Sequence, residues 1–131
     1  MNLNKFKYII PSLIPAIIIF ILSHQPNVKI PDIGIGIEDK ILHIAAYFIF
    51  GLCLVYSITG IKKGINNRTL LTILLLIGAS YALSDEIHQY YVPGRESDIA
   101  DFIADVAGII ISYFFHPSIR KIIRRFEKTN V

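Results

Sequence analysis

The sequence predicts an all-α integral membrane protein, a four-helix bundle with both termini in the cytoplasm. Composition gives the first indication: of 131 residues, 53% are hydrophobic and only 18% are charged. A soluble domain usually carries about 25% charged residues. The second indication is four successive hydrophobic segments of roughly bilayer-crossing length. The third is the placement of the basic residues, which concentrate at every second connection between those segments.

The expected spans are residues 6–23, 41–59, 69–87 and 99–116, within a single domain that covers residues 1–131. Crossing the hydrocarbon core takes about 20 residues, with a range of roughly 17–25. The first two segments meet this length outright, and the last two meet it with polar ends that dip into the interface. The first segment follows Lys5 and Lys7, as in a signal peptide, but no small-residue cleavage site comes after it. We therefore interpret it as a retained span.

Orientation follows from the basic residues. Ten of the 13 lysines and arginines lie near the N-terminus at positions 5 and 7, in loop 60–68 or in the tail after residue 116. The positive-inside rule therefore predicts a multi-pass protein of the bacterial cytoplasmic membrane with both termini inside and loops 24–40 and 88–98 outside. Nearly all the acids lie in or beside those outer loops. The net charge of +3 gives no indication of a nucleic-acid partner. The basic tail is either a topology signal or an amphipathic helix on anionic lipid.

The stretch from Ser84 to Asp105, "SDEIHQYYVPGRESDIADFIAD", places many titratable groups between two strongly apolar runs. At 3.6 residues per turn, Asp39, His43 and Tyr47 share a face of the second helix. A face of the third helix holds Ser84, Asp85 and His88, with Glu86 to the side. Asp98, Asp101 and Asp105 share a face of the fourth, continued by Gly108 and Ser112. Glycine and serine are where membrane helices approach closely, so these faces are expected to meet in one acidic pocket.

Two chemistries suit such a pocket. Histidines and carboxylates can hold a divalent metal ion, and Asp39/His43 and Asp85/His88 have workable ligand spacings on helices. Alternatively these groups act as general acid and base. Arg95, after the "VPG" turn, either folds back over Asp98 and Asp101 or grips an anionic group. A third interpretation is a polar network that only holds the helices together, although buried ion pairs stabilise poorly compared with apolar packing.

Four segments together resemble the VanZ-like family of small bacterial membrane proteins. They are "SHQP" after the first span, "DKILHIAAYFIFG" in the second, "YALSDEIHQYYVPGR" closing the third and "DFIADVAG" in the fourth. Two positions depart from the pattern: His24 replaces a usual second serine, and Ser112 stands where a glycine is frequent. The matching positions are Ser23, Gln25, Asp39, Lys40, His43, Tyr47, Ser84, Asp85, Glu86, Gln89, Pro93, Arg95, Asp101, Asp105 and Gly108.

The resemblance implies an association with tolerance to glycopeptides, particularly lipid-bearing teicoplanin. It leaves three functions open: a membrane enzyme acting on a lipid-linked cell-envelope intermediate, a non-catalytic accessory that limits access of a lipoglycopeptide, and a small proton-coupled transporter. The expected partners are membrane lipids with such an intermediate or lipoglycopeptide, and the oligomeric state is open.

The candidate site residues fall into three groups. The candidates for catalysis are Asp39, His43, Asp85, Glu86, His88, Asp101 and Asp105. The candidates for binding substrate or an anion are Lys40, Tyr47, Ser84, Gln89, Arg95 and Asp98. The candidates for a divalent metal ion, the expected cofactor if there is one, are Asp39, His43, Asp85, His88 and Asp101.

Overall fold

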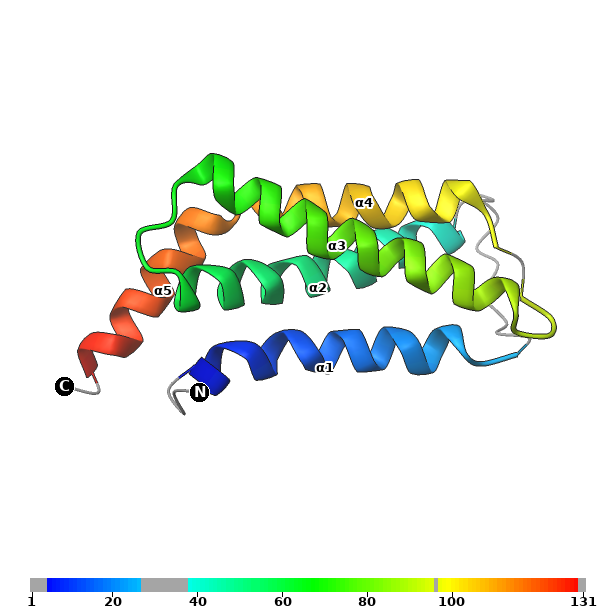
Figure 1. Cartoon of the computed structure of the whole chain (residues 1–131), viewed down its shortest axis with the longest axis horizontal. Helices are drawn as coiled ribbons and strands as arrows, with labels where there is room; N and C mark the ends of the chain where they lie inside the picture. The colour runs from blue at the N-terminus through cyan, green and yellow to red at the C-terminus, as the bar shows by residue number, and fades with distance from the viewer. Residues whose placement is uncertain (1–4, 27–37, 96, 130–131) are drawn as a thin grey trace.

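The protein is all-helical in the computed structural model, which describes residues 5–26, 38–95 and 97–129. These residues form five helices and no strand: α1 (Phe6–Ser23), α2 (Glu38–Ile61), α3 (Asn67–Tyr90), α4 (Ile99–Tyr113) and α5 (His116–Thr129). The first four run side by side along the molecule, and α5 leaves the bundle obliquely at the end that also holds the N-terminus (Figure 1). Three charged residues of the expected outer loops, Lys29, Asp32 and Glu96, lie outside the described residues.

Three helices, α1, α2 and α3, are individually long and apolar enough to cross a membrane, whereas α4 reaches this length only together with α5, at a bend of 55°. The expected fourth span, residues 99–116, is therefore wrong at its end, and a fifth helix follows. Pro117 explains the break, because it has no N–H to donate to the carbonyl of Tyr113. The ring nitrogen Nδ1 of His116 lies 2.8 Å from that carbonyl oxygen instead.

Side-chain caps and glycine turns set the helix boundaries. Asn66 caps α3 by accepting a hydrogen bond from the backbone N–H of Thr69 at 2.8 Å. Asp98 caps α4 by accepting from the N–H of Ala100 at 2.9 Å. Gly94 closes the "VPG" turn with φ of 79°, a left-handed conformation that glycine adopts without a steric penalty. The cap and the turn fix where the polar loop meets the bundle.

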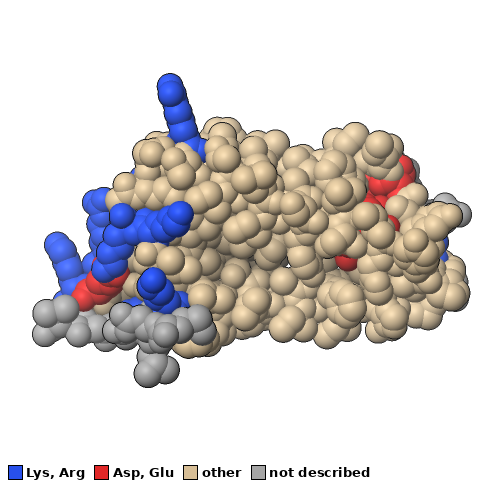
Figure 2. Space-filling view, viewed as in Figure 1, with Lys and Arg blue, Asp and Glu red and all other residues tan. Residues whose placement is uncertain are grey.

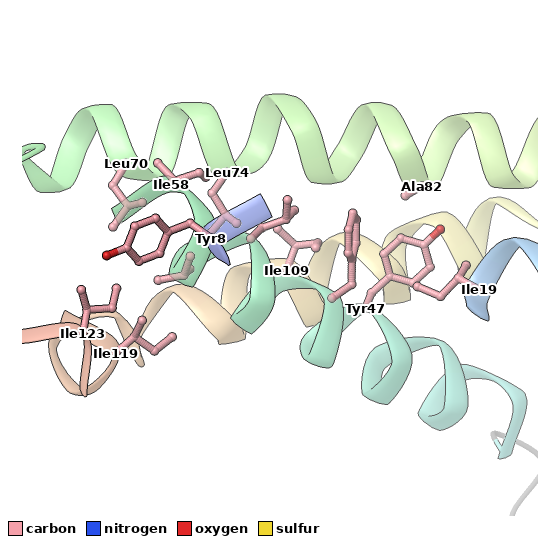
Figure 3. Packing of buried hydrophobic residues seen from close by; sticks show 13 residues of the cluster. Tyr8, Ile19, Tyr47, Ile58, Leu70, Leu74, Ala82, Ile109, Ile119 and Ile123 are labelled. Carbon is pink, nitrogen blue, oxygen red and sulfur yellow. The ribbon is translucent and has the colours of Figure 1, made fainter. Parts of the chain in front are cut away.

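The pair α2·α4 forms the most extensive contact between helices. Its closeness depends on Gly108, where a Cβ atom would lie 2.5 Å from the carbonyl oxygen of Ile44 and 2.8 Å from the nitrogen of Phe48. Ser112, one turn further along α4, lies against Gly51 of α2. The expected small-residue contact along the acidic face of α4 is therefore confirmed. Figure 3 shows the apolar core continuing from here, with Ile109 near its middle.

The outer surface has an apolar middle and two charged ends. α1 alone exposes nine large apolar side chains, among them Ile14 and Ile17 at 55% and 57%. Lysine and arginine gather at the end where both termini lie, and acids appear at the opposite end (Figures 1 and 2). Below, these are called the basic end and the acidic end. An apolar belt between charged ends fits a membrane protein.

Candidate functional site

Side chains from α2, α3 and α4 meet at the acidic end, and they do so around His43. The ring nitrogen Nδ1 of His43 lies 2.8 Å from Oδ1 of Asp105, which is fully buried on α4. An ionised carboxylate only accepts hydrogen bonds, so Nδ1 carries the proton and donates it. In the neutral imidazole Nε2 then has the lone pair, and it lies 3.8 Å from a carboxylate oxygen of Asp39. A histidine held by a buried carboxylate in this way is oriented for proton transfer at Nε2.

Lys40 is the cation that neutralises the rim of the site. Its ammonium donates to Asp98 at 3.2 Å and to Asp39 at 3.4 Å, and it also forms a hydrogen-bonded ion pair with the buried Asp101. The predicted alternative for Arg95, folding back over Asp98 and Asp101, is not what the structure shows, because Lys40 occupies that position. The N–H of Ala100, followed by the ammonium of Lys40, holds the pKa of the Asp98 carboxyl below its ordinary value.

A second polar chain starts at Asp85 and leads to Arg95. Tyr47 and Gln89 both donate to Oδ2 of Asp85, each at 3.2 Å. The amide of Gln89 also donates to Ser23 at the end of α1, at 3.4 Å, and its oxygen accepts from Arg95 at 3.0 Å. Because guanidinium can only donate, this bond fixes which way the Gln89 amide points. The chain holds Arg95 beside the site, while its Nε is buried and has no hydrogen-bond partner among the residues that the structure describes.

The helical wheel places Glu86 to the side of the polar face. In the structure, its side chain instead points into the bundle. It is 5% exposed, and its Oε2 accepts from the Ser97 hydroxyl at 3.1 Å and from the N–H of Asp98 at 3.2 Å. Its other oxygen, Oε1, is buried, as is Oδ2 of Asp105, and neither has a hydrogen-bond partner within the described part of the chain. Glu86 therefore ties the loop before α4 to α3 and presents an unsatisfied oxygen to the interior.

The structure does not bring His88 or Ser84 into this cluster. His88 stacks with His24 and Phe20, with Nε2 of His88 3.2 Å from Nδ1 of His24. Ser84 is exposed and donates to the carbonyl of Tyr81 in its own helix. The inward face of α3 is centred near Gln89, between Asp85 and Glu86, so it is rotated by about 100°, one residue, from the predicted face.

A groove of about 380 Å³ opens beside these residues, between α1, α2 and α3. One part of its wall is apolar and includes Ile19, Leu22, Leu42, Ala46 and Ile49. The other part is polar and consists of Ser23, Asp39, His43, Tyr47, Asp85, Gln89 and Arg95. Leu22, Leu42 and Ile49 are each more than half exposed, within the apolar belt. Ligand pockets have volumes of about 300–1,000 Å³, so the groove can take an amphipathic molecule that has one apolar and one polar part.

Two groups of residues, among those the structure describes, have ligand atoms close enough together for a metal ion. The first is Asp39, His43 and Asp101, all of them predicted candidates, and the second is His43, Glu86 and Asp105. Within each group the ligand atoms lie within 4.8 Å of one another. The remaining candidates, Asp85 and His88, belong to neither group. Imidazole with two carboxylates is a donor set that suits zinc or manganese.

Neither the groove nor the role of Ser97 is evident from the sequence. Ser97 supplies a hydrogen bond to Glu86 that depends on the folded loop, and a serine in a polar loop gives no signal of this. The groove depends on how α1 leans against α2, which helical periodicity does not reveal. Only the family resemblance points to Ser23 in the sequence. In the structure, its hydroxyl accepts a hydrogen bond from Gln89.

Comparison with known protein families gives a match over most of the chain. The sequence model of the VanZ/LLP1 family matches residues 1–120, which include every residue of the site. Searches of curated proteins and of solved structures found no match.

Proposed function

This chain belongs to the VanZ/LLP1 family, and from that premise we propose that it is a multi-pass protein of the bacterial cytoplasmic membrane whose acidic end faces outward. The separation of charge supports this orientation: the basic end collects ten of the 13 lysines and arginines. Basic loops remain in the cytoplasm during insertion. Both termini would then be cytoplasmic, and the groove would open near the outer leaflet.

At this site the protein acts on a lipid-linked molecule of the cell envelope. One observation carries the proposal: a single groove joins exposed apolar side chains such as Leu22 and Leu42 to the polar group of His43, Asp85 and Arg95. The apolar wall would receive a hydrocarbon chain from the surrounding leaflet. The head group would then lie at the polar end, where the guanidinium of Arg95 can bind a phosphate or carboxylate.

The chemistry best supported is general acid–base catalysis by His43. His43 lines the groove while Asp105 holds its Nδ1, so His43 can take a proton through Nε2 from a water or substrate hydroxyl that attacks the head group. Asp105 is a positioning residue, since it is fully buried behind the histidine. The proton on Nε2 would return to the leaving group in the second half of the reaction.

The alternative of metal-assisted chemistry competes for the same lone pair. A cation bound by His43 with Asp39 and Asp101, or with Glu86 and Asp105, would prevent His43 from acting as a base. Elemental mass spectrometry of the purified protein separates the two mechanisms. Stoichiometric metal in the wild type would favour the metal-assisted mechanism over acid–base catalysis by His43. Loss of the metal in Asp101→Asn would identify the first ligand group, and loss in Glu86→Gln would identify the second.

The groove is tested with Ala46→Phe, which fills it from α2, beside Leu76→Phe, which enlarges a side chain that is 64% exposed on α3. The lipids that co-purify with each protein are identified by mass spectrometry. We expect the wild type and Leu76→Phe to retain one envelope lipid class that Ala46→Phe lacks. Identical lipid profiles for all three proteins would refute the groove as the binding site.

The second candidate function is binding without catalysis, in which the protein limits access of a lipoglycopeptide such as teicoplanin to the membrane. Asp39 and Asp98, with side chains 41% and 49% exposed, give the rim an acidic surface that favours a cationic group. Growth of an expressing bacterium in teicoplanin distinguishes the two. Catalysis requires that both Ala46→Phe and His43→Gln lose tolerance, whereas pure binding requires that only Ala46→Phe does. Tolerance unaffected by either variant would dissociate the site from this phenotype.

A further inference from the structure

The basic end carries a second surface that is independent of the groove, on helix α5. This helix has the sequence HPSIRKIIRRFEKT. At about 100° per residue, Ile119, Ile122, Ile123 and Phe126 form one apolar arc. Lys121, Arg124, Arg125 and Lys128 form a basic arc on the opposite side. A short helix with these two faces is typical of segments that lie in a membrane interface.

The apolar arc of α5 is divided between the bundle and the surface. Ile119 and Ile123 are buried at 9% and 6% exposure and belong to the core cluster (Figure 3). Ile122 is 46% exposed, and Phe115, just before the helix, is equally exposed. The bundle therefore fixes one half of the arc, and the other half continues the apolar belt. This places the axis of α5 at the edge of the belt, where phospholipid head groups begin.

The one acid of α5, Glu127, is engaged by partners outside the basic arc. Glu127 accepts a hydrogen bond from the Tyr8 hydroxyl at 2.7 Å and pairs with Lys63 at 2.9 Å. Arg120 is also held, since it donates to the carbonyl of Ile65 at 2.8 Å. These three bonds anchor α5 to α1 and to the loop after α2. They also pair the one acid of α5 with groups that lie outside the basic arc.

The basic arc has four cations, and no acid of the described residues pairs with any of them. Lys121, Arg124, Arg125 and Lys128 are all exposed, and within the described ranges none of them forms an ion pair. Together with Arg120 they line a hollow of about 530 Å³. Figure 2 shows this end of the molecule as a concentration of basic side chains. Such clusters next to a membrane attract anionic lipid head groups.

We propose that the basic face of α5 is a binding site for anionic phospholipid, which it takes by the phosphate head group from the leaflet at the basic end. Charge complementarity and the position of the helix at the edge of the apolar belt select this occupant. The site is at the opposite end of the bundle from the groove, so it does not depend on the function proposed there.

The test uses the whole protein in mild detergent and native mass spectrometry with phosphatidylglycerol or phosphatidylcholine added. The variant Lys121→Gln/Arg125→Gln/Lys128→Gln removes three charges from the basic arc. Its control, Lys5→Gln/Lys62→Gln/Arg68→Gln, removes two lysines and one arginine from exposed positions at the same end. We expect the wild type and control to bind phosphatidylglycerol several-fold more than phosphatidylcholine, and the α5 variant to lose this preference.

Two further measurements complete the test. In the first, the charge-keeping variant Lys121→Arg/Arg125→Lys/Lys128→Arg should retain the preference for phosphatidylglycerol. In the second, inorganic phosphate should displace the lipid only at concentrations where sodium chloride of equal ionic strength displaces it too. No preference in the wild type would overturn the proposal, as would an equal loss in the control variant, which would indicate net charge alone. Displacement by phosphate well below that ionic strength would identify a site for the free ion instead.

Discussion

His43 on α2 and Asp105 on α4 are joined by a 2.8 Å contact between Nδ1 and Oδ1, inside a bundle where Asp105 has no solvent exposure. A carboxylate in such a place is stable only while its partner remains. The two residues are 62 positions apart in the sequence, and the close approach of α2 and α4 at Gly108 lies one turn from Asp105. The same packing that builds the core therefore also builds the site.

The first prediction concerns this pair. His43→Leu leaves a buried carboxylate without its partner, so it should lower the free energy of unfolding by about 3–5 kcal/mol. The double variant His43→Leu/Asp105→Leu removes both polar groups and should recover most of that loss. Unfolding in detergent mixtures, followed by circular dichroism, measures both. A double variant as unstable as the single one would show that the pair is not coupled.

The second prediction compares two cations of the site. Lys40→Met strips Asp101, which is 4% exposed, of its ion-pair partner and should cost about 1–3 kcal/mol. Arg95→Gln should change stability by less than about 0.5 kcal/mol, since Arg95 makes one hydrogen bond to Gln89. The midpoint of thermal unfolding reports both. A larger effect for Arg95→Gln would reverse the assignment of Lys40 as the structural cation.

The third prediction concerns the α2·α4 contact. Gly108→Ala would place its Cβ atom 2.5 Å from the Ile44 carbonyl oxygen, so the helices must separate, at a cost of at least about 1–3 kcal/mol. Gly64→Ala is the matched control: nothing lies within 4 Å of its Cβ position, and only its φ of 75° is unfavourable. Its cost should be near 1 kcal/mol.

The measurement is again unfolding in detergent, together with the growth in teicoplanin that the proposed function links to the site. Gly108→Ala should lower both the stability of the protein and the growth in teicoplanin, because it displaces Asp105 relative to His43. If Gly108→Ala were no worse than Gly64→Ala, the two helices would have more room than the structure shows.

The fourth prediction concerns pH. The pKa of Asp98 is lower in the folded protein than in the unfolded chain, where it has its ordinary value. Its ionised form therefore contributes stability that is fully present above the unfolded pKa and is lost as the pH falls through the folded pKa. Asp98→Asn keeps a helix cap but has no charge to titrate. As the pH is lowered from 7 to 3, the midpoint temperature of thermal unfolding should fall less steeply for Asp98→Asn than for the wild type. Parallel profiles would exclude a contribution from this carboxylate.

Much of the fold follows from the sequence because hydrophobic length and small-residue spacing act locally. The spans in α1, α2 and α3 were predicted close to the helices that the structure contains, and the contact of Gly108 and Ser112 with α2 followed from their position on the acidic face. The end of the fourth helix was mispredicted because hydropathy does not register the missing N–H of Pro117. That one atom ends α4 at Tyr113 and releases α5.

The site was predicted less completely. The sequence correctly predicts that three side chains meet in the bundle interior, because each lies on a helix face that continues into small residues. These are His43, Asp101 and Asp105. His88 was grouped with Asp85 by a helical wheel, but the wheel gives only relative angles within α3. The absolute rotation of α3 is set by its packing on α2 and α4, which turns Glu86 and Gln89 inward and leaves His88 beside His24.

The sequence by itself determined that the chain is helical, that its helices are apolar enough to cross a membrane, and that its basic and acidic residues lie at opposite ends. These properties depend on hydropathy, charge and periodicity, which act over a few turns of one helix. Only the tertiary structure decided that Lys40 neutralises the rim, that Asp105 orients His43 and that an apolar groove meets these groups. Each of these relationships joins different helices, and it is the packing between helices that brings the atoms within bonding distance.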